Sequence, residues 1–171
     1  RMKPDGSVGR SIPRIDAVEK VTGEAVFTTD LTFPGMLYAK VLRSPYPHAR
    51  IVSIDISQAE KLPGVAAVAT WENTTDVPYN SSCSEANPPA VPVEDEQIFN
   101  RELRYVGDEV AAVAADSEET ALAALKLIRV EYEELPYYLE PEDALKEGAY
   151  PIHKDSNVIE EVVQEAGDVE K

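Results

Sequence analysis

Histidine and cysteine side chains are the groups in this sequence that could most readily serve as a base, a nucleophile or a metal ligand. There are only three of them: His48, His153 and Cys83. The two histidines lie far apart, and neither has a second nitrogen or sulfur ligand at the spacing of a zinc site. One cysteine cannot form an internal disulfide, and an iron–sulfur cluster needs about four cysteine ligands. The sequence therefore predicts no metal site within this chain.

His48 allows two interpretations. It stands in the segment Arg43-Ser44-Pro45-Tyr46-Pro47-His48-Ala49. Beside Arg43 it could act as a general base or contact an anion. Alternatively, the prolines form a rigid connection in which the histidine bonds a neighbouring backbone group. No acid or nucleophile stands next to His48 in the sequence, and this favours the structural interpretation.

Cys83 could pair with His48 or His153 as a thiol nucleophile and its base. It lies within a segment rich in serine, asparagine and proline, and Glu85 is close by. Negative charge near a thiol disfavours the thiolate form that a nucleophile needs. We therefore expect no reactive thiol.

The remaining polar candidates also give no catalytic arrangement. Glu133 and Glu134 are adjacent, so on a strand they point to opposite faces and cannot flank one substrate atom. Tyrosines 132, 137 and 138 are interpreted as half-buried strand and turn residues. No glycine belongs to a dinucleotide-binding or phosphate-binding motif. We expect no catalytic and no cofactor-binding residue in this chain. The glycines are Gly6, Gly9, Gly23, Gly35, Gly64, Gly107, Gly148 and Gly167.

Charge and length limit the possible partners and location. Lys and Arg number 16 and Asp and Glu number 32, which gives a net charge of −16. Such a surface repels nucleic-acid phosphates and anionic lipid, so we expect neither as a partner. No apolar run is long enough for a membrane span, and the polar start lacks the apolar core of a signal peptide. A cytoplasmic protein with one main domain is expected for 171 residues.

The hydrophobic pattern predicts the elements that would position any site. The first 30 residues are expected to be irregular, and residues 74–92 to form a long surface loop. Strands are expected at 36–42, 49–56, 65–70, 103–106, 109–115 and 129–133, and helices at 57–62, 117–127 and 141–146.

Local signals refine this prediction. Ser57 and Asp116 are each followed by a glutamate three residues later, so both are expected to begin a helix as capping residues. Gly107-Asp108 lies between two apolar runs and predicts a hairpin turn. Strand–helix–strand occurs twice, which is too few units for a doubly wound sheet. The prediction is an α+β domain, with two main helices on one face of a mixed sheet. The second helix is expected to bury Ala121, Leu122, Leu125 and Ile128.

Five segments resemble, in their order and spacing, the N-terminal α/β hammerhead domain of the xanthine dehydrogenase and aldehyde oxidase family. The resemblance implies an irregular arm at 1–13, the hammerhead domain at 14–152, and a linker at 153–171 toward a molybdopterin-binding domain. The segments are Arg14–Gly23 with Ala25 and Asp30; Pro34–Leu37 with Arg43–Ala49; Ile54-Asp55 with Ser57, Ala59 and Pro63-Gly64-Val65; Arg104–Val113; and Val130–Pro136.

The resemblance implies a role within a larger enzyme. Family members hydroxylate an aldehyde or an aromatic heterocycle with water-derived oxygen at a molybdenum centre, and relatives act on an aromatic thioester or carbon monoxide. Electrons leave through [2Fe–2S] clusters, usually to FAD. The cofactor contacts and the glutamate base belong to a C-terminal region with no counterpart here. This chain alone is therefore expected to be inactive, and to pack on the molybdopterin-binding region and on iron–sulfur and FAD parts. His48 and the Cys83 loop are candidates for that contact surface.

Two alternatives remain at this point. The chain could be a stand-alone acidic protein-binding module that kept the fold without the enzyme. It could also be a small independent hydrolase that uses His48 or Cys83.

Overall fold

The computed structural model describes residues 9, 11–79, 96–153, 156–158 and 166–167. The chain forms two compact units, Arg1–Met36 and Leu37–Lys171. None of the helices in the described ranges has the length and apolar character needed to cross a membrane.

The first unit contains more regular structure than its glycines and prolines suggest. Helix α1 (Ala17–Thr22) and a short 3-10 helix (Thr28–Asp30) lie in the part expected to be irregular. Gly23 ends α1 with a φ of 79°, the left-handed conformation that glycine adopts at low cost. Asp16 pairs with Lys20 one turn later at 2.6 Å. The prediction of an irregular segment was wrong here because the glycines and prolines flank α1 and do not interrupt it.

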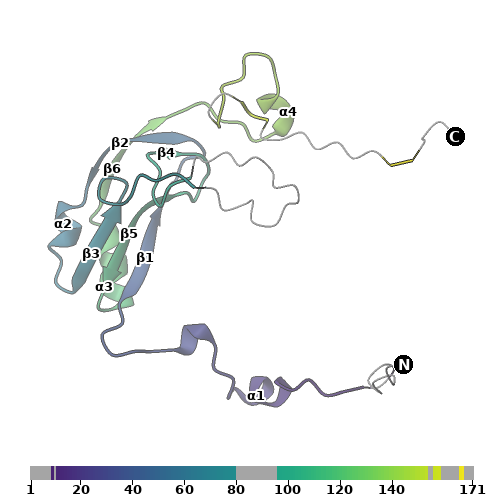
Figure 1. Cartoon of the computed structure of the whole chain (residues 1–171). Helices are drawn as coiled ribbons and strands as arrows, with labels where there is room; N and C mark the ends of the chain where they lie inside the picture. Colours follow the sequence, from purple (N-terminus) through teal and green to yellow (C-terminus); the bar gives the residue numbers. More distant parts are fainter. Residues whose placement is uncertain (1–8, 10, 80–95, 154–155, 159–165, 168–171) are drawn as a thin grey trace. The chain divides into compact units, whose positions relative to one another are not determined.

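In the described residues of the second unit, six strands form two three-stranded sheets, and every pairing between these strands is antiparallel (Figure 1). One sheet has the order β1-β5-β3 and the other β4-β2-β6. The expected α+β class with few helices is confirmed. The strands are β1 (Tyr38–Arg43), β2 (Ala49–Asp55), β3 (Val65–Thr70), β4 (Glu102–Leu103), β5 (Glu109–Ala115) and β6 (Arg129–Glu134). The helices are α2 (Ser57–Glu60), α3 (Glu118–Leu125) and α4 (Pro141–Ala144).

Consecutive strands of the second unit alternate between the sheets. The chain passes from β1 to β2, from β2 through α2 to β3, and from β5 through α3 to β6, and each step changes sheet. The hairpin predicted at Gly107-Asp108 was therefore wrong. Strand β4 pairs with β2, whereas β5 is held between β1 and β3, so both hydrogen-bonding edges of β5 are occupied.

Small side chains form the core between β5 and α3. Ala111, Val113 and Ala115 of β5 are fully buried, as are Ala121 and Ala124 of α3. Because alanine projects little beyond the backbone, the helix can approach the sheet closely. The predicted face of this helix was correct for Ala121 and Ile128, which are buried, and Leu125 packs against the same cluster. It was wrong for Leu122, whose side of the helix faces solvent.

The helix starts differ from the capping prediction. Ser117, and not Asp116, caps α3, since its hydroxyl oxygen accepts a hydrogen bond from Thr120 N at 3.1 Å. Ser57 lies inside α2, and its backbone N–H donates to the Asp55 carboxylate at 2.9 Å. At α3 the acceptor is the N-cap residue itself, whereas at α2 it is Asp55, the residue before the N-cap Ile56.

Gly64 lies close to Asp116, two residues before α3 begins. Its φ is +93°, and a Cβ atom added there would lie 2.5 Å from Asp116 Oδ1, at the end of an exposed side chain. Asp116 N also donates to Gly64 O at 2.9 Å, so the two segments cannot separate without losing that bond. The Gly64–Asp116 contact therefore holds the start of β3 next to the start of α3.

We predict that Gly64→Ala lowers the free energy of unfolding by more than Gly148→Ala does, by about 1 kcal/mol from backbone strain and in addition by the cost of moving the Asp116 carboxylate. Gly148→Ala is the matched control, since Gly148 also has a positive φ of 78° but no atom near the added Cβ. We expect about 1 kcal/mol there. Urea unfolding of both variants checks this, and equal losses would contradict the clash.

Candidate functional site

Two segments that cross between the sheets lie side by side and exchange backbone hydrogen bonds. One follows β1 and the other leads into β5. Ser44 N donates to Asp108 O at 2.8 Å, and Gly107 N donates to Ser44 O at 2.9 Å. Gly107 has a φ of +101°. We call Arg43, Ser44, Gly107, Asp108 and Glu109 the inter-sheet junction; it joins two of the sequence segments that carried the family resemblance.

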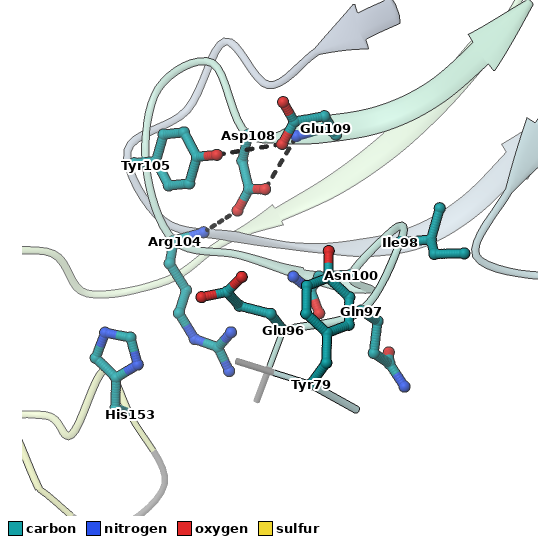
Figure 2. A pocket seen from close by; sticks show the side chains of 10 residues that line it. All are labelled: Tyr79, Glu96, Gln97, Ile98, Asn100, Arg104, Tyr105, Asp108, Glu109 and His153. Atoms are coloured by element: carbon teal, nitrogen blue, oxygen red, sulfur yellow. Dashed lines mark hydrogen bonds between the residues drawn. The ribbon is translucent and has the colours of Figure 1, made fainter. Parts of the chain in front are cut away.

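Asp108 is the buried carboxylate of the inter-sheet junction. It is 5% exposed and accepts hydrogen bonds from Arg104 N at 2.8 Å and from Glu109 N at 2.9 Å (Figure 2). Burial raises the pKa of Asp108 above its ordinary value, and the two backbone N–H bonds offset only part of that rise. The carboxylate therefore closes the turn that precedes β5.

Arg43 and Glu109 form the charged part of the inter-sheet junction. Arg43 Nη1 donates to Gly107 O at 2.7 Å and to Glu109 Oε1 at 2.6 Å. Tyr105 Oη donates to Glu109 Oε2 at 3.2 Å. Burial favours a higher pKa for Glu109, but the bonds from Arg43 and Tyr105 outweigh it and hold the pKa below its usual value. The Arg43 guanidinium thus binds a carboxylate and a carbonyl of its own chain.

His48 is buried within the second unit and is 1% exposed. Its Nδ1 lies 2.5 Å from Pro136 O and its Nε2 lies 3.3 Å from Glu102 Oε1. A general base must reach a proton on the substrate, and this ring is shielded and has both nitrogens engaged. The structural interpretation of His48 therefore holds, although the carbonyl that it bonds is 88 residues away and not a neighbour. The prediction that His48 belongs to a contact surface was wrong, because its side chain is not accessible.

The other residues considered from the sequence do not gather at one place. Cys83 and Glu85 lie outside the described residues. Glu133 pairs with Arg50 on the neighbouring strand at 3.3 Å. Tyr132 is half-buried and packs its ring 5.2 Å from that of Tyr46. These contacts hold strands together and leave no pair of groups aimed at a common point.

A cleft of about 650 Å³ lies beside the inter-sheet junction (Figure 2). His153 lines it, although no periodic pattern in the chain indicates that this histidine meets residues 104–109. In the part of the chain that the structure describes, no group of three or more His, Cys, Asp or Glu side chains could hold a metal ion. The lining residues are Tyr79, Glu96, Gln97, Ile98, Asn100, Arg104, Tyr105, Asp108, Glu109 and His153.

Residues 22–136 match the family described as aldehyde oxidase and xanthine dehydrogenase, a/b hammerhead domain. The chain is 48% identical over 159 residues to a probable xanthine dehydrogenase subunit of Bacillus subtilis, covering 92% of this chain and 20% of that protein. It is 41% identical to the xanthine dehydrogenase molybdenum-binding subunit of Escherichia coli O157:H7, covering 92% and 21%.

Solved structures agree with the sequence matches. The quinoline 2-oxidoreductase from Pseudomonas putida 86 is 36% identical with a TM-score of 0.74, over 89% of this chain and 20% of that chain. The aldehyde oxidoreductase from Desulfovibrio gigas is 33% identical with a TM-score of 0.71, over 84% and 16%. The chain thus spans about a fifth of the length of the relatives that it matches.

We predict that Asp108→Ala lowers the free energy of unfolding by about 1–2 kcal/mol, because two half-buried backbone N–H groups lose their acceptor. Asp143→Ala is the control, since Asp143 is partly exposed and its partner Lys146 lies on the surface. An exposed ion pair contributes little, so a much smaller loss is expected. Chemical denaturation measures both, and similar losses would contradict a special role for Asp108.

We also predict that Asp108 titrates above its ordinary pKa of 3.8. Because the folded state holds the proton more tightly than the unfolded chain, the stability that this proton contributes is complete below pH 3.8. It is lost as the pH rises through the raised pKa. A ¹³C NMR titration of the Asp108 carboxyl carbon measures the midpoint, and a value at or below 3.8 would contradict the burial argument.

Proposed function

The chain belongs to the aldehyde oxidase and xanthine dehydrogenase family, as its α/β hammerhead domain, and from that premise we propose the following role. It is a non-catalytic domain of the molybdenum-cofactor subunit of a hydroxylase. The complete enzyme inserts water-derived oxygen into a carbon of an aldehyde or an aromatic heterocycle. The chain alone is inactive.

The observation that carries this proposal is the extent of the match. Nearly the whole chain aligns, yet it covers only about a fifth of relatives named as xanthine dehydrogenase subunits. Relatives named xanthine dehydrogenase, nicotinate dehydrogenase and quinoline 2-oxidoreductase support an aromatic heterocycle as the substrate. The stand-alone binding module is not favoured, since the matched proteins are enzyme subunits.

The proposal places every cofactor outside this chain. Molybdenum–molybdopterin belongs to the remaining part of the subunit, and [2Fe–2S] clusters and FAD belong to other domains or subunits of the holoenzyme. The domain extends over 14–152, with an arm before it and a linker at 153–171. The holoenzyme works in the cytoplasm, and neither nucleic acid nor a membrane is a partner.

Apolar side chains in the first unit support packing against other parts of the enzyme. Large exposed apolar surfaces commonly mark sites of protein contact. In the described part of this unit none of the residues is buried. The exposed apolar side chains are Ile12, Ile15, Val18, Val21, Val26, Phe27, Leu31, Phe33 and Met36.

The test compares the full-length subunit, assembled with its partner subunits, with residues 1–171 alone. Molybdenum content by mass spectrometry and turnover of xanthine and an aldehyde are measured for both. We expect metal and turnover only in the full-length protein. If residues 1–171 bind molybdopterin, or oxidise an aldehyde with no other polypeptide present, the proposal is wrong.

A further inference from the structure

We propose that His48 is a pH-sensitive attachment point for the segment that follows β6. We call residues 136–152, which include α4, the α4 segment (Figure 1). When both ring nitrogens of His48 carry a proton, the side chain holds this segment and β4 together. When one proton is lost as the pH rises, that hold weakens.

The His48 ring contacts both ends of the α4 segment. Its Nδ1 lies 2.5 Å from Pro136 O, at the first residue of the segment. Near the other end, the Tyr150 ring packs edge-on against the imidazole, with the ring centroids 5.6 Å apart. Tyr150 N also donates to Tyr138 Oη at 2.7 Å, which ties the two ends of the segment to each other. A change at this one ring therefore reaches the whole segment.

Both ring nitrogens of His48 face hydrogen-bond acceptors. The Pro136 carbonyl can only accept, so Nδ1 must carry a proton. Nε2 lies 3.3 Å from Glu102 Oε1, and a carboxylate also only accepts. A neutral imidazole has a single N–H and would turn a lone pair toward that carboxylate. The two contacts are therefore both attractive only when the ring carries two protons and a positive charge.

The charged groups around His48 leave room for that positive charge. Arg50 on β2 binds Glu102 on β4 at 3.4 Å and Glu133 on β6 at 3.3 Å. One guanidinium and two carboxylates sum to +1 − 2 = −1, and a charged His48 ring brings the group to zero. The ring is only 1% exposed, and a buried charge is tolerated when it is paired and hydrogen-bonded. From the α4 segment, the titratable side chain that faces the ring is Tyr150.

The direction of the pH effect follows from these contacts. Histidine loses its charge between about pH 5 and about pH 8. On the loss, Nε2 no longer donates to Glu102, whereas Nδ1 keeps its bond to Pro136 O. The ring then lacks one of its two anchors, and Tyr150 packs on a less firmly held surface. The α4 segment is therefore held more firmly at the lower pH than at the higher one.

The experiment measures hydrogen–deuterium exchange by mass spectrometry on the full-length subunit assembled with its partner subunits. Exchange is followed at about pH 5.5 and about pH 8, across the range in which histidine changes charge, and is corrected for the intrinsic effect of pH on amide exchange. We expect the protection of peptides from the α4 segment to fall about fivefold or more at the higher pH, because a charge-assisted hydrogen bond is lost. Peptides from α3 are the internal reference and should keep their protection.

Three variants identify the group responsible. His48→Asn keeps a donor near the position of Nδ1 but has nothing to titrate, so the pH response should disappear. Glu102→Gln keeps an acceptor without the charge and should at least halve the response. His153→Gln is the matched control, since His153 is half-buried directly after the α4 segment, and its response should equal that of the wild type. Thermal unfolding checks that each variant folds.

Two results would overturn the inference and leave the proposed function untouched. One is a wild-type α4 segment that is equally protected at both pH values. The other is a pH response that persists in His48→Asn or disappears in His153→Gln. If His48→Asn does not fold, Glu102→Gln decides, because an undiminished response in that variant contradicts a bond between the two side chains.

Discussion

The paired backbone groups of Ser44, Gly107 and Asp108 are the constraint on which the second unit depends. Two chain segments cross between the sheets here, and backbone N–H and C=O groups buried at such a crossing must find partners. Each segment supplies the partners of the other, at 2.8 and 2.9 Å. The Asp108 carboxylate then binds the N–H groups at both ends of its turn. With this crossing fixed, β5 can begin in register with β1 on one side and β3 on the other.

The same arrangement engages the charged residues of the inter-sheet junction in contacts within the domain. A catalytic acid or base needs one face directed at a substrate. Arg43, Asp108 and His48 instead bind carbonyls, backbone N–H groups or carboxylates of their own chain. These bonds fix the ends of β1, β2 and β5 and the turn that precedes β5.

Local patterns in the sequence were enough to predict most elements but not their pairing. Strand β3 lies where its valine-rich run and the preceding Pro63-Gly64 place it, and β6 ends shortly before Pro136. The hairpin prediction at Gly107-Asp108 failed because glycine followed by aspartate is equally suited to a hairpin and to a turn between sheets. The difference depends on Ser44, more than sixty residues earlier. Likewise, nothing near His48 indicates that its partner is the carbonyl of Pro136.

The sequence alone could show that side chains able to bind a metal are few. It could not show which residues come together to line the cleft. One cysteine and two histidines argue against a metal centre without any structure. The cleft beside the inter-sheet junction, by contrast, combines Tyr79, Ile98 and Tyr105 with His153, and no periodic pattern links these positions. A surface of this kind arises only when the chain folds back along itself.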